Sequence, residues 1–142
     1  MKILIDTNVI IDALTSREPW NVSAEKIFIM AANHNIEMYI TASSATDIYY
    51  LLRKHLHSTE MAKQVMGKLY VLAGILEVTG MDCAEALGSP IKDYEDAVVE
   101  KVAYRKDMDY IVTRNIKDYQ AGNVKVILPD EFVMMVEESG IL

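Results

Sequence analysis

The sequence predicts an α/β fold built on a parallel β-sheet. Five short apolar runs, rich in β-branched or aromatic residues, have the length and composition of buried strands. Longer segments with the apolar spacing of helices lie between these runs, and this alternation is typical of βαβ units with right-handed crossovers. No internal repeat, low-complexity tract or Pro/Gly-rich linker interrupts the chain, so we expect a single domain over residues 1–142.

The elements are expected in the following order. Strands are expected at residues 3–5, 38–40, 75–78, 110–112 and 124–127. Helices are expected at residues 22–33, 44–56 and 94–108, where apolar side chains recur at every third or fourth position. A final helix is expected to open at Pro129 and Asp130, because proline favours the first turn of a helix.

Two helix starts carry the spacing of a capping box, in which two side chains three residues apart satisfy free backbone N–H groups. Ser44 is followed by Asp47, and Asp93 is followed by Asp96. We therefore expect these two helices to begin near Ser44 and Asp93.

The composition excludes several classes of protein. A hydrophobic content of 51% and a charged content of 25% are ordinary for a folded domain and exclude wholesale disorder. The single cysteine, Cys83, forms no internal disulfide, and the sequence holds no Cys/His cluster for a structural zinc ion. Asp6 and Asp12 interrupt the apolar run at the N-terminus, unlike a signal peptide or a membrane span. We expect a cytoplasmic protein that does not cross a membrane.

The net charge is −7, from 21 acidic and 14 basic residues. This balance argues against a broad, non-specific grip on nucleic acid, which depends on many contacts between basic side chains and phosphates. It leaves a nucleic-acid enzyme open, because bound divalent cations reverse the local field at an acidic site. The positions of the carboxylates therefore matter more than their total.

Four aspartates are expected to meet at one edge of the sheet. Asp6 directly follows the first strand, Asp47 lies about one turn inside the helix after the second, and Asp96 lies in the first turn of a helix. Asp118 follows the fourth strand after a short connection. Ionised carboxylates that lie close together raise one another's pKa unless a cation neutralises them. The arrangement predicts a site for Mg²⁺ or Mn²⁺, hard cations that prefer oxygen ligands.

Each acidic residue also has a purely structural interpretation. Asp6 and Asp93 are suited to cap helices, and Asp47 to complete the capping box of Ser44. Asp96 favours the positive end of a helix, and Asp118 alone is an ordinary exposed carboxylate. Only their joint placement distinguishes a metal site from these alternatives.

Polar neighbours are candidates for a supporting shell. Thr7, Asn8, Thr113 and Asn115 lie beside strand ends, where they are placed to bond a carboxylate or a metal-bound water, or to satisfy the start of a helix.

Aromatic and basic side chains are candidates for contact with RNA. Tyr50, Arg53 and Arg114 combine an aromatic face with positive charge, although a packed tyrosine and solvated arginines account for them more simply. Arg17 and Trp20, before the second helix, are placed either to line an entrance or to anchor a surface loop.

Four segments together resemble the PIN domain family. The subgroup to which they are most similar is the VapC-like toxins of prokaryotic toxin–antitoxin systems. The segments are Ile3-Leu4-Ile5-Asp6-Thr7-Asn8, Thr41-Ala42-Ser43-Ser44-Ala45-Thr46-Asp47-Ile48-Tyr49-Tyr50, Asp93-Tyr94-Glu95-Asp96-Ala97 and Tyr110-Ile111-Val112-Thr113-Arg114-Asn115-Ile116-Lys117-Asp118-Tyr119.

The resemblance implies a three-layer α/β/α fold whose five-stranded parallel sheet has the order 3-2-1-4-5. It also implies a ribonuclease dependent on Mg²⁺ or Mn²⁺, a homodimer, and inhibition by a small antitoxin. The acidic positions of the family correspond to Asp6, Asp47, Asp96 and Asp118, with Thr7 and Asn115 as polar neighbours.

Two features depart from the family pattern. The second acidic position is often Glu in the family and here is the shorter Asp47, and Asp93 adds a carboxylate near Asp96, which leaves the ligand at that helix start open.

Other functions share parts of this pattern. The alternatives are a PIN-fold nuclease outside a toxin–antitoxin pair, acting in RNA processing or on DNA, and a catalytically silent binding protein. A phosphorylatable receiver domain fits poorly, since Asp82 is displaced from the end of the third strand and no Lys follows the fifth.

Overall fold

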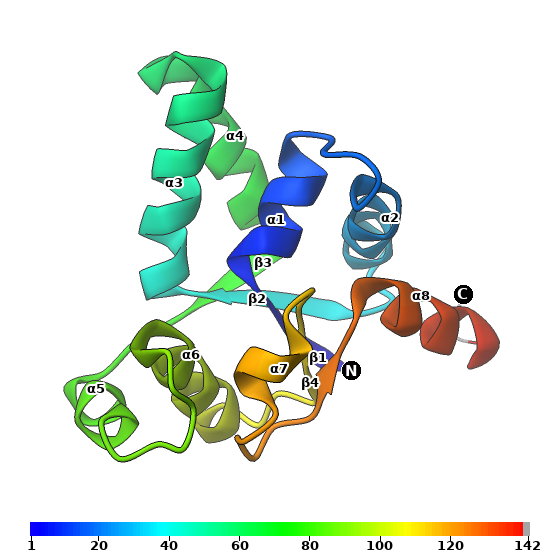
Figure 1. Cartoon of the computed structure of the whole chain (residues 1–142). Helices are drawn as coiled ribbons and strands as arrows, with labels where there is room; N and C mark the ends of the chain where they lie inside the picture. The colour runs from blue at the N-terminus through cyan, green and yellow to red at the C-terminus, as the bar shows by residue number, and fades with distance from the viewer. Residues whose placement is uncertain (141–142) are drawn as a thin grey trace.

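The computed structural model describes residues 1–140, which form a five-stranded parallel sheet with helices on both faces (Figure 1). The strand order is β3-β2-β1-β4-β5, as the family resemblance implies. The strands are β1 (Lys2–Ile5), β2 (Glu37–Thr41), β3 (Ala73–Leu76), β4 (Tyr110–Val112) and β5 (Val126–Ile127). In the central pairing, Ile3 is in register with both Met38 of β2 and Tyr110 of β4.

The helices form one layer on each side of the sheet (Figure 1). The first layer contains α1 (Thr7–Leu14), α2 (Asn21–Ala32), α3 (Ala42–Leu56), α4 (Thr59–Leu72) and α8 (Pro129–Glu138). The second layer contains α5 (Gly80–Ala86), α6 (Tyr94–Arg105) and the short α7 (Ile116–Tyr119). Within residues 1–140, no helix has both the length and the apolar character that crossing a bilayer requires.

Two hydrophobic cores lie on opposite faces of the sheet because successive strand residues point to opposite sides. In β1, Ile3 and Ile5 pack with the first helical layer, whereas Leu4 packs with the second. In β4, Val112 and Ile111 divide in the same way. The continuous apolar runs of the sequence thus correspond to strands that are buried on both faces.

Side-chain caps fix where several helices begin. Asp6 accepts a hydrogen bond from the backbone of Thr7 at the start of α1, and Asp93 accepts one from the backbone of Asp96 at the start of α6. The expected capping box at Ser44 and Asp47 is wrong. The N-cap of α3 is Thr41, whose hydroxyl accepts from the backbone of Ser44. Because Thr41 is also the last residue of β2, this strand runs directly into its helix.

The third strand begins two residues earlier than expected. It spans Ala73–Leu76, and its Gly74 pairs with Tyr39 of β2. A Cβ atom on Gly74 would lie 2.7 Å from the ring of Tyr39, so glycine is needed where the ring covers the strand. Small residues have little β-propensity of their own, and it is the pairing with β2 that makes this segment a strand.

The carboxyl ends of the central strands meet at one edge. Asp6 follows β1, Thr41 ends β2 and Thr113 follows β4. Asp6 also donates its backbone N–H to the carbonyl of Val112, over 3.0 Å, which ties the ends of β1 and β4 together. This edge holds the candidate site.

Candidate active site

A pocket of about 560 Å³ opens at the carboxyl edge of the sheet. Four carboxyl groups line it: Asp6 at the start of α1, Asp47 on α3, and Glu95 and Asp96 in the first turn of α6. The remaining lining residues are Thr7, Asn8, Ile11, Arg17, Ser44, Tyr50, Leu51, Val99 and Asn115. We call this the carboxylate pocket.

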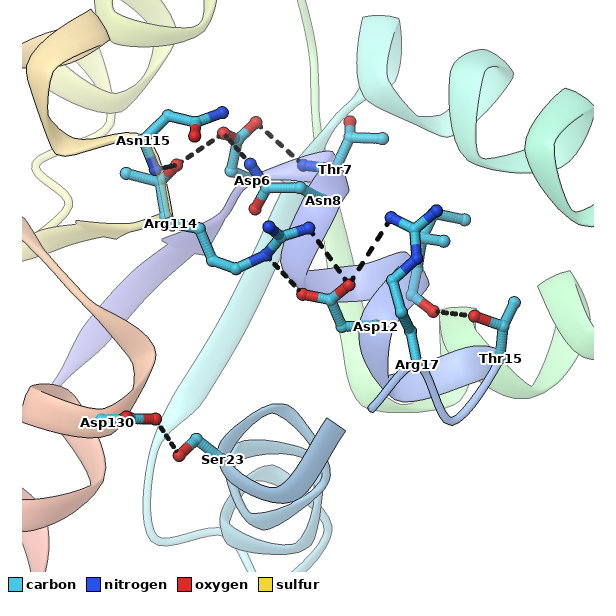
Figure 2. A network of polar contacts seen from close by, with 12 residues as sticks. Asp6, Thr7, Asn8, Asp12, Thr15, Arg17, Ser23, Arg114, Asn115 and Asp130 are labelled. Atoms are coloured by element: carbon cyan, nitrogen blue, oxygen red, sulfur yellow. Dashed lines mark hydrogen bonds and ion pairs between the residues drawn. The ribbon is translucent and has the colours of Figure 1, made fainter. Parts of the chain in front are cut away.

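Asp6 is held by three hydrogen bonds at the bottom of this pocket (Figure 2). Its carboxylate accepts from the hydroxyl of Thr113 over 2.7 Å, from the backbone of Thr7 over 2.9 Å, and from the side-chain amide of Asn8 over 3.3 Å. Burial raises the pKa of Asp6 against the effect of these bonds, and the charge of Asp118 raises it further. The carboxylate is therefore oriented, and its charge is only partly compensated.

Asp96 is affected by the same combination of burial and nearby negative charge. Burial raises the pKa of Asp96 to about 6, and the nearby charges of Asp6, Asp93 and Asp118 add to this effect. The opposing influence is the phenol of Tyr119, which donates to Asp96 over 3.0 Å. Burial raises the pKa of the Tyr119 phenol as well, so the phenol remains a donor.

Glu95 and Asp47 face one another across the pocket from α6 and α3. A hydrogen bond to Asp47 raises the pKa of Glu95 to about 7, with further contributions from burial and from the charges of Asp47, Asp93 and Asp96. Near neutral pH, the carboxyl group of Glu95 is therefore protonated in part of the molecules. The carboxyl groups of the pocket lie so close together that they are not all fully ionised at the same time.

A buried carboxylate holds two arginines beside the pocket (Figure 2). Asp12, 1% exposed, accepts from Arg114 over 2.7 and 3.3 Å and pairs with Arg17 at 4.0 Å. Arg17 lines the carboxylate pocket, whereas the guanidinium of Arg114 stacks 4.1 Å from the ring centre of Trp20. The arrangement fixes positive charge next to the carboxylates.

The structure brings most of the expected site residues together. Asp6, Asp47, Asp96, Thr7, Asn8, Asn115 and Tyr50 all line the carboxylate pocket. Thr113 is buried behind it and reaches Asp6 through its hydroxyl, which also accepts from the backbone of Asn115.

The other expected residues lie outside the pocket lining. Asp118 is exposed on α7 and acts on Asp6 and Asp96 through its charge, and Asp93 caps α6. Arg53 donates to Thr59, near the far end of α3, and Arg114 is engaged with Asp12 and Trp20.

Three groups of the site go beyond those expected to carry its chemistry. Glu95 stands next to Asp96 in the sequence, but only the meeting of the amino-terminal turns of α3 and α6 at the carboxyl edge of the sheet brings it to Asp47. Tyr119 ends the fourth segment that resembles the family and was given no role there, but its phenol contacts Asp96. Arg17, for which a surface anchor was the simpler interpretation, lines the pocket.

The donor set fits a divalent cation, although no finished cage is present. In the part of the chain that the structure describes, no group of three or more His, Cys, Asp or Glu side chains is arranged tightly enough to hold a metal ion. The side-chain oxygen of Asn8, however, is buried and has no hydrogen-bond partner among these residues. An unsatisfied acceptor beside crowded carboxylates is the environment that a hard cation or its bound water neutralises.

Comparison with known proteins agrees with this fold. The model of the PIN domain family matches residues 2–117. The DNA-bound VapBC of Salmonella typhimurium is similar in structure, with a TM-score of 0.68 and 16% identity over 91% of this chain and 98% of that chain. FitAcB of Neisseria gonorrhoeae gives a TM-score of 0.64 and 19% identity, with 89% and 97% of the two chains covered.

A third similar structure is a Mycobacterium tuberculosis VapC toxin described as cleaving the sarcin–ricin loop. Its TM-score is 0.62 and its identity 13%, over 77% of this chain and 86% of that chain. No curated protein matches the sequence. Since the family model spans most of the residues, including the strand ends that build the carboxylate pocket, the chain belongs to the PIN domain family.

Proposed function

We propose that the protein is a metal-dependent endoribonuclease that hydrolyses phosphodiester bonds in RNA. We further propose that it acts in the cytoplasm as the toxin of a toxin–antitoxin pair. The observation that carries the proposal is the carboxylate pocket, where burial and mutual repulsion raise the pKa values of Asp6, Glu95 and Asp96. Buried carboxylates that lie this close together destabilise the folded protein, and a bound cation removes that cost.

Asp6, Asp47, Asp96 and Asp118 would hold Mg²⁺ or Mn²⁺. When bound, such an ion lowers the pKa of a water molecule and stabilises the charge that develops on the phosphate. Glu95 stands beside Asp47 and Asp96, and we include it among the acidic groups of the proposed site.

The protein's own residues supply orientation and positive charge. Thr113 and Tyr119, both in the segment after β4, hold the carboxylates of Asp6 and Asp96 in place through their hydroxyl groups. Arg17, at the rim of the pocket, is the basic residue among those that line it, and it offers a counter-charge to an RNA phosphate.

The names of the similar proteins support a toxin–antitoxin role. VapBC of Salmonella typhimurium and FitAcB of Neisseria gonorrhoeae are complexes, and the first is bound to DNA. We accordingly propose a small antitoxin as the partner of this chain and a homodimer as its assembly. Co-purification of a short neighbouring gene product, with the mass of the complex measured by light scattering, tests both. A chain that purifies alone as a monomer would contradict them.

Cleavage of transfer, ribosomal and messenger RNA tests the nuclease activity directly. We expect the purified protein to cleave at least one of these RNAs with Mn²⁺ or Mg²⁺, and EDTA to abolish the cleavage. Asp6→Asn and Asp96→Asn are expected to be inactive, because each removes a carboxylate from the pocket while keeping the shape of the side chain.

Asp107→Asn is the matched control for these variants. Asp107 is exposed at the opposite, amino-terminal edge of the strands, and its φ of 55° is one that asparagine tolerates. We expect this variant to cleave like the wild type. Equal cleavage by the wild type and Asp6→Asn would assign the activity to a contaminant and defeat the proposal.

A further inference from the structure

A second, smaller pocket adjoins the carboxylate pocket. Its volume is about 300 Å³, and Trp20, Arg114, Asn115, Leu128, Pro129 and Asp130 line it. Asn115 lines both pockets, so the two lie next to one another. We call the smaller one the Trp20 pocket.

Trp20 is exposed but held in place. Its side chain is 45% exposed, although the guanidinium of Arg114 covers one face of the ring at 4.1 Å. Arg114 in turn is fixed by two hydrogen bonds to the buried Asp12 (Figure 2). An aromatic ring that a cation covers on one face, and that is still 45% exposed, has surface free to stack against a flat ligand.

Positive charge follows the same path. The chain carries a net charge of −7, yet Arg17 lines the carboxylate pocket and Arg114 the Trp20 pocket. Both arginines pair with the single carboxylate of Asp12, which leaves a net positive charge on this group of three residues. Among the residues that line the carboxylate pocket, Arg17 is the one that offers positive charge to a phosphate.

We propose that the Trp20 pocket binds an unpaired nucleobase of the RNA substrate, stacked on the free face of Trp20, with the adjoining phosphate beside Arg17. This rests on the proposed nuclease function, because it places the base next to the carboxylate pocket. The amide of Asn115 and the carboxylate of Asp130, which accepts from Ser23, border the pocket and face the edge of the base. Bases in a duplex are already stacked on their neighbours, so the substrate class is single-stranded or looped RNA.

Trp20 itself reports on this pocket, because it is the only tryptophan of the chain. We would titrate the Asp6→Asn variant, without added metal, with hexaadenylate and hexauridylate. Stacking is expected to quench the tryptophan emission, and hexaadenylate more strongly because purines stack better. An abasic ribose-phosphate hexamer of equal charge is expected to give no quenching.

Two results of this titration would overturn the proposal. The first is unchanged emission at oligonucleotide concentrations where the anisotropy of a fluorescein-labelled hexamer shows that it is bound. The second is quenching by the peptide Gly-Arg-Phe-Arg-Gly but by neither oligonucleotide, which would assign the pocket to a protein segment.

Variants of Trp20 test the same contact without its fluorescence. In the Asp6→Asn background, Trp20→Leu is expected to weaken binding of the labelled hexamer roughly tenfold, and Trp20→Phe to retain most of the affinity. Tyr104→Leu, which removes a 62% exposed aromatic side chain on α6 beside the opposite edge of the sheet, is the control and is expected to bind normally. Binding within twofold of the parent by a folded Trp20→Leu protein would contradict the proposal. If that variant does not fold, the quenching experiment decides.

Cleavage by the wild type with Mn²⁺ is measured separately and keeps the two proposals apart. If cleavage depends on metal but the emission of Trp20 does not change, base binding in the Trp20 pocket is rejected and the nuclease function is retained. The nuclease function is rejected only if no metal-dependent cleavage of RNA is observed, whether or not the emission of Trp20 changes.

Discussion

The phenol of Tyr119 donates a hydrogen bond to the carboxylate of Asp96 over 3.0 Å, from a side chain that is 1% exposed. The ring packs in the core beneath the second helical layer, so the hydroxyl has no freedom to turn away. The bond opposes the burial that raises the pKa of Asp96. The buried Tyr119 thus influences how readily Asp96 ionises in the carboxylate pocket.

Tyr119→Phe removes this donor and leaves the packing of the ring intact. We expect RNA cleavage to fall about tenfold and the Mn²⁺ concentration needed for half-maximal activity to rise, since Asp96 becomes harder to ionise. The stability cost is about 1 kcal/mol. Tyr104→Phe, at an exposed position of α6, is the control. An unchanged metal requirement in Tyr119→Phe would show that the hydroxyl is merely structural.

Asp96→Asn is expected to stabilise the metal-free protein while abolishing cleavage. The folded pKa of Asp96 is about 6, above its usual value of 3.8. The folded state therefore binds more protons than the unfolded state between about pH 4 and pH 6, and stability is lost as the pH rises through this window. Above pH 6 the gain from Asn is about 1–2 kcal/mol, after allowance for solvent screening. Urea denaturation of both proteins across pH 4–8 measures it.

Adding Mg²⁺ or Mn²⁺ gives the complementary result. The wild type is expected to melt at a higher temperature as the metal concentration rises, because the ion binds only the folded state. Asp96→Asn is expected to gain much less. A shift of equal size in both proteins would mean that the ion binds elsewhere.

A double-mutant cycle tests the pair of Asp12 and Arg114. Arg114→Met leaves Asp12 buried with only the longer contact to Arg17, and we expect a loss of about 3 kcal/mol in the free energy of unfolding. Asp12→Asn together with Arg114→Met is expected to cost less than the sum of the single changes. Lys26→Met breaks an exposed pair with Glu137 at 3.9 Å and is expected to cost under about 1 kcal/mol. Additive losses would contradict the coupling.

Asp82 determines part of the acid stability. Hydrogen bonds from Arg105 lower the pKa of Asp82 to about 2, from a usual value of 3.8. Its contribution is present above about pH 4 and is lost as the pH falls towards 2. We expect Asp82→Asn to cost about 2 kcal/mol at pH 7 and to flatten the decline in stability between pH 4 and pH 2.

Glu77→Gln is the control for Asp82. It changes an exposed carboxylate that pairs with Arg105 and Lys106 at 3.6 Å, and its expected cost is under about 1 kcal/mol. A loss in Glu77→Gln as large as in Asp82→Asn would mean that the charge of Arg105, and not its buried contact, carries the effect.

The sheet and three of the expected carboxylates could be predicted because they depend on short-range patterns. Apolar runs marked strands that are buried on both faces, and parallel strands bring their carboxyl ends to one edge. Asp6, Asp47 and Asp96 were therefore expected in one place, and all three line the carboxylate pocket. Their roles as metal ligands stay a prediction.

The remaining features depend on how distant elements pack. Glu95 approaches Asp47 because α3 and α6 both begin at the carboxyl edge of the sheet, and no local spacing encodes this. The cap of α3 is Thr41 and not Ser44, although both carry a hydroxyl, because β2 runs into the helix without a loop. The sequence did not predict α4, because exposed apolar residues such as Met61 and Val71 obscure the helical spacing of its few buried residues.

Two neighbouring residues after β4 bind α1 at two points along its length. Thr113 donates a hydrogen bond to Asp6 at the start of the helix, and Arg114 donates to Asp12 one and two-thirds turns later. These two bonds fix the position of α1 along and around its axis relative to the end of β4. One residue inserted into α1 would swing Asp12 by about 100° away from its guanidinium. The connection between α1 and α2 depends on the same group, because Arg17 pairs with Asp12 and Trp20 stacks on Arg114, so a change of its length would displace the Trp20 pocket as well.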